Sequence, residues 1–269
     1  MIRYALRVQY VGKNYAGSQL QLENGKPIEG LPTIQGELEK AISTLTVKGA
    51  RRCESDCAKE YNRPIKTIFS GRTDRGVNAK GQIVHFDVEE PIVASKFLYQ
   101  INEILPDDIS VDEMREVAET FHAQKSAISR VYRFEFVNRR IKNAYDGDLM
   151  RVKFPINIGR MQKSLNYLLG EHDFSSFKSS GTLNPSKVCT LTKAECYLAD
   201  GERVVIDIEG NRFLYNMVRT IVGTLLEIEG HNLQPEHMKD VLEAKDRTKA
   251  GQTVSPYGLT LMEVKYNKI

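Results

Sequence analysis

The sequence predicts an α+β protein whose strands form a largely antiparallel mixed sheet. Three observations support this class: helices separate strands in both halves of the chain, several predicted strands follow one another directly, and no repeat of fixed period is present. The chain has 269 residues, 41% hydrophobic and 27% charged, which is typical of a globular protein that buries a core. We expect two parts, residues 1–110 and 111–269, joined at the polar stretch Pro106–Ser110.

The first part opens with its clearest element. Along Ile2–Tyr10, large apolar or aromatic side chains at even positions alternate with Arg3, Ala5, Arg7 and Gln9. This period of two predicts a strand with one buried face. Beyond Thr33, apolar residues at helical spacing predict a helix over residues 34–45. Residues 48–66 lack any apolar period, so we expect a long, polar and basic insertion there. The remaining expected elements are a short strand over 68–69, a strand over 81–88 and a helix over 94–105 that Pro106 ends.

The second part begins with an aromatic strand. Residues 131–137 place Tyr132, Phe134 and Phe136 on one face. The other expected elements are a helix over 158–169 closed by Gly170, paired strands over 189–197 and 203–209, a long apolar helix over 213–229, a helix from Pro235 and a final strand over 259–266.

Charge is unevenly distributed, although the net charge is only +3. Residues 46–80 carry nine lysines and arginines against four acidic residues, and residues 120–165 carry ten against three. Concentrated cations suit phosphate binding, but solvated loops would have the same composition. Without a long apolar run or a signal peptide, we expect a cytoplasmic chain with no membrane association. The spacing of Cys53 and Cys57 is poor for zinc, so we expect reduced thiols.

The loop Ser70–Gly76 is the strongest candidate for chemistry. Two glycines frame its charged residues and allow a sharp turn at a sheet edge. Asp74 lies between cations that favour its ionised form. An ionised carboxylate there can be a nucleophile, a metal ligand, a general base or a turn residue, and spacing alone leaves these alternatives open. The loop lacks the pattern of a Walker A phosphate loop.

Other candidates lie in the second part. Arg219 interrupts an apolar helix, where a guanidinium is costly unless a carboxylate pairs with it or it points to water. Tyr132 lies between Arg130 and Arg133, so its ring either stacks on a nucleobase or packs in the core. Isolated histidines in apolar surroundings, His85 and His172, are expected to be structural.

Gly71-Arg-Thr-Asp-Arg-Gly-Val77 resembles the signature of the TruA-type tRNA pseudouridine synthases, and the resemblance runs along nearly the whole chain. Five further segments match that family in the right order: Tyr10–Gln21, Asn102–Pro106, Gly170–Phe177, Phe213–Arg219 and Gly258–Leu261. One such match is weak, whereas the ordered set is highly specific.

The resemblance implies the pseudouridine synthase fold, with two similar α/β halves around a catalytic cleft, in a homodimer that embraces tRNA. It implies isomerisation of uridine to pseudouridine at positions 38 to 40 of the anticodon stem-loop, without metal or organic cofactor. In the family, Asp74 would be the nucleophile and Arg72 would occupy the stack after the uridine flips out. Tyr132 would pack against the flipped base, and Arg219 would pair with Asp74. A non-catalytic tRNA-binding or chaperone protein on the same scaffold is the alternative.

The chain departs from the family pattern at a few positions. Asn78 stands where the family usually has histidine, Arg75 where a small residue is common, and Ser18 where tryptophan is frequent. The basic insertion is longer than expected for the family, and we hypothesise that it adds phosphate contacts. An unchanged tRNA affinity and salt dependence after its deletion would contradict that hypothesis.

Overall fold

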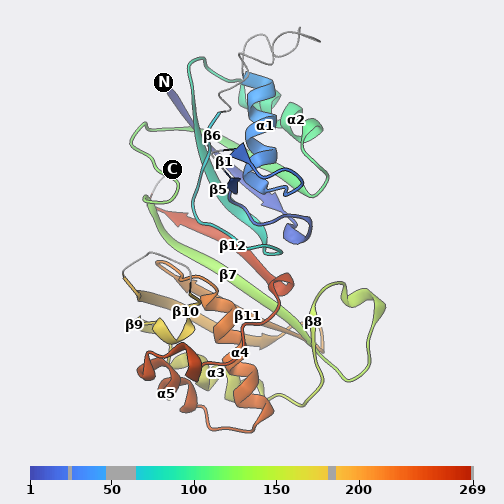
Figure 1. Ribbon diagram of the computed structural model, residues 1–269, viewed down its shortest axis with the longest axis vertical. Coiled ribbons are helices and arrows are strands. Elements are labelled where there is room, and N and C mark those ends of the chain that lie inside the picture. Colours follow the sequence, from blue (N-terminus) through green and yellow to red (C-terminus); the bar gives the residue numbers. More distant parts are fainter. Residues whose placement is uncertain (24–25, 47–64, 181–185, 268–269) are drawn as a thin grey trace. The chain divides into compact units, whose positions relative to one another are not determined.

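The computed structural model describes residues 1–23, 26–46, 65–180 and 186–267, which form two compact units (Figure 1). The first unit comprises Met1–Ala127 and Glu263–Ile269, and the second comprises Ile128–Met262. Apart from residues 65 and 66, the expected basic insertion lies outside the described residues, together with Cys53 and Cys57. No helix within the described ranges is long and apolar enough to cross a bilayer.

An antiparallel sheet forms the base of the first unit, in the order β6–β1–β5, with the short β4 also paired to β5. The bounds are β1 Ile2–Tyr10, β4 Ile68–Phe69, β5 Asn78–Val88 and β6 Ile109–Val117. The predicted strand β1 is confirmed, and its side chains at Tyr4, Leu6, Val8 and Tyr10 are buried. The short strands β2 (Leu22–Glu23) and β3 (Lys26–Pro27) pair antiparallel with each other.

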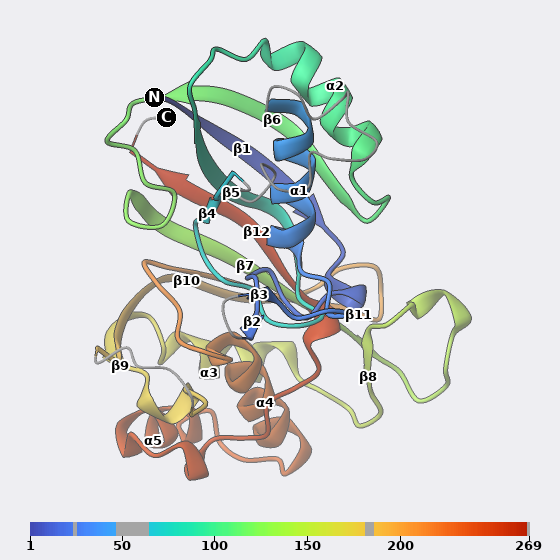
Figure 2. The same cartoon turned by 45° about the horizontal axis from the view of Figure 1, so that its top comes forward.

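Two helices, α1 (Ile34–Thr46) and α2 (Ala94–Ile104), lie together on one face of this sheet (Figures 1 and 2). Helix α1 begins where the sequence predicts, because the hydroxyl of Thr33 accepts the N–H of Gly36 at 3.2 Å and caps the first turn. Apolar side chains from α1 and α2 fill the interface with the sheet, and Phe97 of α2 stacks on Phe86 of β5 with ring centroids 6.1 Å apart.

The first unit extends past the expected joint at Pro106–Ser110. Strand β6 follows that joint and pairs with β1 from Arg3 to Tyr10. Residues 109–117 are therefore part of the same hydrogen-bonded sheet as the start of the chain, and the compact units divide only after Ala127.

His85 of β5 lies on the sheet face opposite the helices, beside a cluster that includes Phe121 and Tyr266. Its side chain is 2% exposed, and its Nδ1 accepts the N–H of Ala123 at 3.1 Å. Burial, with a smaller contribution from the charge of Arg3, lowers the pKa of His85 to about 4. The neutral ring is thus part of the core packing, in agreement with the structural role expected from the sequence.

We expect the free energy of unfolding to fall as pH decreases from about 6.5 to about 4. In this window the unfolded chain protonates His85 while the folded chain does not, so the unfolded state binds more protons and acidification favours it. The loss from this residue should be roughly 3 kcal/mol, at about 1.4 kcal/mol for each unit of pKa difference. Urea unfolding at several pH values measures it. His85→Gln should flatten the dependence, and replacement of the exposed His231 by glutamine should not. Identical slopes for His85→Gln and the unchanged chain would refute this origin.

The second unit contains a sheet in the order β7–β11–β10–β9, with β8 beside β7. The bounds are β7 Ala127–Asn138, β8 Met150–Val152, β9 Gly170–Asp173, β10 Val188–Leu198 and β11 Arg203–Gly210. These pairings are antiparallel except that of β7 with β8, which is parallel. The predicted pairing of residues 189–197 with 203–209 is confirmed. Strand β12 (Leu259–Tyr266) also has its predicted bounds, and its residues are shared between the two units.

Three helices belong to the second unit: α3 (Ile158–Asn166), α4 (Met217–Gly230) and α5 (His237–Ala244). The predicted start of α4 at residue 213 is wrong, because Asn216 adopts a left-handed conformation with φ of 61° and interrupts the helical path. Helix α3 ends earlier than predicted, and Gly170 instead begins β9 with φ of 97°. Helices α3 and α4 are linked by a two-point ion pair between Arg160 and the fully buried carboxylate of Glu229.

Candidate active site

The loop that carries Arg72 and Asp74 runs beside residues 17 and 18 in the manner of a strand pair. Asp74 forms an antiparallel bridge with Gly17, and the N–H of Ser18 donates to the carbonyl of Thr73 at 3.0 Å. Burial alternates along the loop: Thr73 is buried, whereas Arg72 is exposed and Asp74 is half-buried. The two charged residues on either side of Thr73 are thus accessible to solvent, Arg72 more than Asp74.

Gly17 is required for this close pairing. Its φ of +124° lies in a region that residues with side chains rarely adopt. A Cβ at this position would also lie 3.0 Å from the carbonyl oxygen of Thr73. A glycine in the opening motif is therefore needed for that motif to lie against the Asp74 loop, although the two segments are far apart in the sequence.

Beneath the loop lies a network of buried polar side chains that connects β1 and β5 to residues 70–73; its members are Tyr10, Ser70, Thr73 and Gln82. This network was not predicted from the sequence. The sequence does contain a signal for it, because Gln82 lies on the buried face of β5 with Val84, Phe86 and Val88, where a polar amide needs hydrogen-bond partners.

Two departures from the family pattern have structural partners in the first unit. The hydroxyl of Ser18, which is fully buried, accepts the N–H of Thr73 at 2.8 Å. The side-chain oxygen of Asn78 accepts the N–H of Gly12 at 2.9 Å. Both residues thus hold the segments that flank Asp74, whereas Arg75 is exposed.

Tyr132 lies on β7 of the second unit, opposite Ile208 of β11. It is 8% exposed, and its ring meets that of Phe213 edge to face, with centroids 5.0 Å apart. The neighbouring arginines have protein partners: Arg133 forms a two-point ion pair with Asp207, and Arg130 donates to a backbone carbonyl. Tyr132 is therefore a largely buried ring, and both neighbouring arginines have partners within the second unit.

Arg219 lies in the first turn of α4 and is half-buried. Its Nε donates to the carbonyl of Val254 at 2.8 Å, and its Nη1 donates to the side-chain oxygen of Asn216 at 2.7 Å. These two uncharged oxygens, which the sequence analysis did not anticipate, offset part of the cost of burying a guanidinium and orient its plane.

The segment Gly251–Val254 packs directly on α4. The N–H of Gly251 donates to the hydroxyl of Thr224 at 3.0 Å. A Cβ on Gly223 would lie 1.8 Å from the carbonyl oxygen of Gln252, so only glycine permits this approach. The position of the Val254 carbonyl, and with it the Arg219 side chain, depends on this contact.

The four site residues predicted from the sequence are divided between the two units. Arg72 and Asp74 belong to the first unit and Tyr132 and Arg219 to the second. The structure brings Arg72 and Asp74 together on one loop. The pairing of Arg219 with Asp74, and the packing of Tyr132 against a flipped base, stay predictions.

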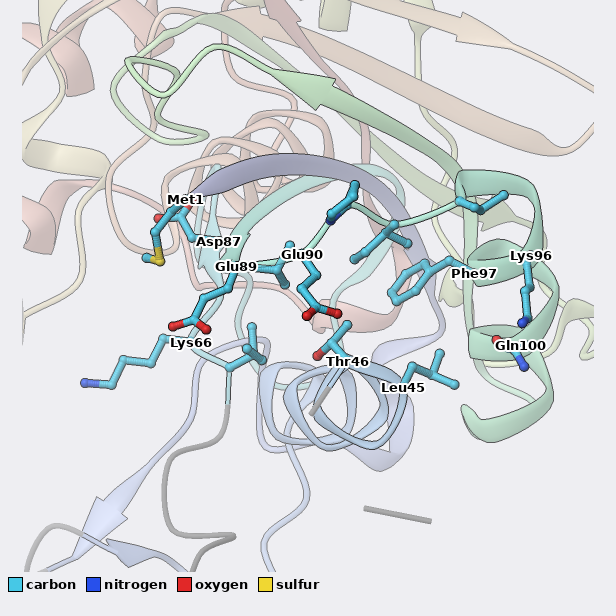
Figure 3. Close-up of a pocket in the computed structure, with 15 residues that line it drawn as sticks. Met1, Leu45, Thr46, Lys66, Asp87, Glu89, Glu90, Lys96, Phe97 and Gln100 are labelled. Carbon is cyan, nitrogen blue, oxygen red and sulfur yellow. The ribbon is translucent and has the colours of Figure 1, made fainter. Parts of the chain in front are cut away.

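The first unit also contains an open pocket of about 790 Å³ between α1, α2 and the end of β5 (Figure 3). Its labelled acidic residues are Asp87, Glu89 and Glu90, and neither Arg72 nor Asp74 lines it. Lys66 and Lys96 line the same pocket, so its walls carry charges of both signs. Among the described residues, no group of three or more histidine, cysteine or acidic side chains is arranged to hold a metal ion.

Comparison with known proteins identifies the class. A family model described as tRNA pseudouridine synthase matches residues 165–267. Enzymes of this class are isomerases.

Proteins named tRNA pseudouridine synthase A resemble the chain over nearly its full length. The one from Exiguobacterium sibiricum is 37% identical over 267 residues, which is 99% of this chain and 97% of its own. The one from Caldicellulosiruptor saccharolyticus is 37% identical over 263 residues, 97% of this chain and 98% of its own. A Coxiella burnetii protein is 38% identical over 267 residues, 99% of this chain and 94% of its own. The chain belongs to the tRNA pseudouridine synthase A family.

Proposed function

We propose that the chain converts uridine to pseudouridine at positions 38 to 40 in the anticodon stem-loop of tRNA, with Asp74 as the nucleophile. The relatives' names support the reaction and the tRNA substrate. The motif resemblance supports the positions. The observation that carries the proposal is the accessible placement of Arg72 and Asp74, a cation and a carboxylate, on one firmly held loop.

Each assigned side chain has a task in this reaction. The target uridine must leave the helix, which costs a few kcal/mol of unstacking. The exposed Arg72 is long enough to fill the gap in the stack, and Tyr132 provides an aromatic surface for the everted base. By the family resemblance, Arg219, which Val254 and Asn216 orient, would pair with the Asp74 carboxylate.

The isomerisation is balanced without an external reagent. The bond between the ribose carbon and the uracil nitrogen breaks, the uracil turns, and a ring carbon bonds to the same ribose carbon. The proton lost from that ring carbon is matched by the one gained at the ring nitrogen, so no electrons are exchanged with a cofactor. Asp74 provides the attacking oxygen, and the bond it forms is broken again before the product leaves, which regenerates the carboxylate. The resemblance leaves open whether Asp74 attacks the sugar or the uracil ring, or first removes a sugar proton.

Incubation with unmodified tRNA transcripts tests the proposal. We expect pseudouridine at one or more of positions 38, 39 and 40, mapped by mass spectrometry and by primer extension after carbodiimide treatment. The reaction should proceed in EDTA without an added cofactor. A transcript with cytidine at these positions is the matched control and should remain unmodified. Absence of product, or product only elsewhere in the tRNA, would contradict the proposal.

The same resemblance supports a homodimer in the cytoplasm that binds one class of partner, tRNA. Sedimentation analysis of the purified chain tests the oligomeric state, because a dimer of the 30.5 kDa chain is distinguished easily from a monomer. A monomer at all accessible concentrations would contradict the dimer without affecting the proposed reaction.

A further inference from the structure

We propose that Tyr10, Thr73 and Gln82 are positioning residues, whose buried hydrogen-bond chain sets the placement of Asp74 for the reaction. The inference rests on the proposed role of Asp74 as nucleophile. These side chains contact the loop rather than the substrate, and their effect on the reaction is transmitted through its backbone.

Gln82 anchors the chain of hydrogen bonds in the sheet. Its amide is fully buried, and every polar atom of it has a partner. The amide oxygen accepts the hydroxyl of Ser70 at 2.5 Å, while the amide nitrogen donates to the carbonyl of Gly71 at 2.9 Å and to the hydroxyl oxygen of Tyr10 at 3.3 Å. The residue that precedes Arg72 is thereby tied to β5.

Tyr10 transmits this arrangement to the residue before Asp74. Gln82 donates to the phenol oxygen of Tyr10, and the Tyr10 hydroxyl, which carries one proton of its own, is hydrogen-bonded to the hydroxyl of Thr73 at 2.7 Å. Burial raises the pKa of Tyr10 to about 12, so the phenol keeps this proton at neutral pH. The ring itself is part of the β1 core face and cannot follow the loop if the loop moves.

Thr73 is held at three atoms. Its hydroxyl contacts Tyr10, its N–H donates to the hydroxyl of Ser18 at 2.8 Å, and its carbonyl accepts the N–H of Ser18 at 3.0 Å. The backbone carbonyl of Gly71, which precedes Arg72, is thus hydrogen-bonded. So are the backbone N–H and carbonyl of Thr73, which precedes Asp74. A fully satisfied buried network of this kind specifies one conformation, since any shift would leave a buried donor or acceptor without a partner.

Removal of one buried hydroxyl should therefore displace the Asp74 loop without changing any exposed side chain. A displacement of about 1 Å at a reacting group lowers the rate by about 100-fold. We expect Thr73→Val and Tyr10→Phe, which delete only polar groups, to lower kcat by about 10- to 100-fold with KM for tRNA changed by less than about threefold.

Three comparisons separate positioning from general stability. Thr73→Ser restores the hydroxyl and should keep most of kcat. The double variant of Tyr10→Phe with Thr73→Val should be little worse than either alone, because both break the same chain of hydrogen bonds. Ile101→Val, a fully buried change in α2 outside the network, should lower the melting temperature without lowering kcat.

All variants are assayed at a temperature where circular dichroism shows a folded protein. If one of the two variants Tyr10→Phe and Thr73→Val does not fold, the other is sufficient to test the inference. Wild-type kcat in the folded Thr73→Val or Tyr10→Phe variant would overturn the inference. So would a loss that appears only as a raised KM, or an equal loss in Ile101→Val. An inactive unchanged chain would contradict the proposed function and this inference together, whereas an active chain with unaffected variants would contradict only the inference.

Discussion

Replacement of Asp74 by asparagine should abolish pseudouridine formation, with kcat lowered by about 10⁴-fold or more and tRNA affinity changed by less than about threefold. The amide has nearly the same size as the carboxylate but is not a comparable nucleophile. The contacts that hold the loop come from Gly17, Ser18 and Thr73, and the substitution leaves them in place. The variant should therefore fold and bind normally.

Single-turnover assays and filter binding with the same transcript measure the two quantities. Glu89→Gln is the matched control, because it removes one exposed negative charge from the same unit outside the Asp74 loop. It should keep full activity. Activity retained in Asp74→Asn would refute the nucleophile. An unchanged chain that binds tRNA without forming product would instead favour the non-catalytic tRNA-binding alternative.

Gly223→Ala should lower the free energy of unfolding by about 3 kcal/mol or more. The added methyl carbon would lie 1.8 Å from the carbonyl oxygen of Gln252, far inside contact distance, and that oxygen belongs to backbone. Helix α4 and the segment Gly251–Val254 would have to separate. Since the carbonyl of Val254 orients Arg219, the residual folded protein should also have reduced kcat.

Urea unfolding measures the loss of stability, and Gly230→Ala provides the control in the same helix. A Cβ at Gly230 would meet only the ring of Phe154, at 3.4 Å or more, which is ordinary contact. That variant should be within about 1 kcal/mol of the unchanged chain, because alanine favours the helix over glycine. Comparable stability of the two variants would contradict the steric explanation.

Elements with a sustained hydrophobic period could be predicted from the sequence. Strands β1 and β12 have their expected bounds, and α2 ends beside Pro106 as expected. Strand β6 was missed, because its pairing with β1 shifts register between Arg7 and Val8. The buried positions change from Ile109 and Val111 to Met114 at that irregularity, so no single alternation covers the strand.

The candidate site was predictable only in part, for a similar reason. Asp74 and Arg72 lie in a short contiguous motif, so their place on one loop follows from the sequence. Two partners of Thr73 in this loop, Ser18 and Tyr10, lie 55 and 63 residues away along the chain, and their contact with the loop depends on tertiary structure. The motif in the sequence therefore indicated which charged residues belong to the candidate site. The hydrogen bonds that orient them could be found only in the folded structure.

The division of β12 has a consequence for biosynthesis. Residues from Glu263 onward complete the first unit, where Tyr266 packs on Phe121 and donates its hydroxyl proton to the carbonyl of Ala123 at 2.6 Å. On the ribosome these residues emerge after all of residues 128–262. The unit translated first is thus the last to acquire its full set of contacts, and a nascent chain stalled before Glu263 would present an unfinished Asp74-bearing unit to the cell's proteases.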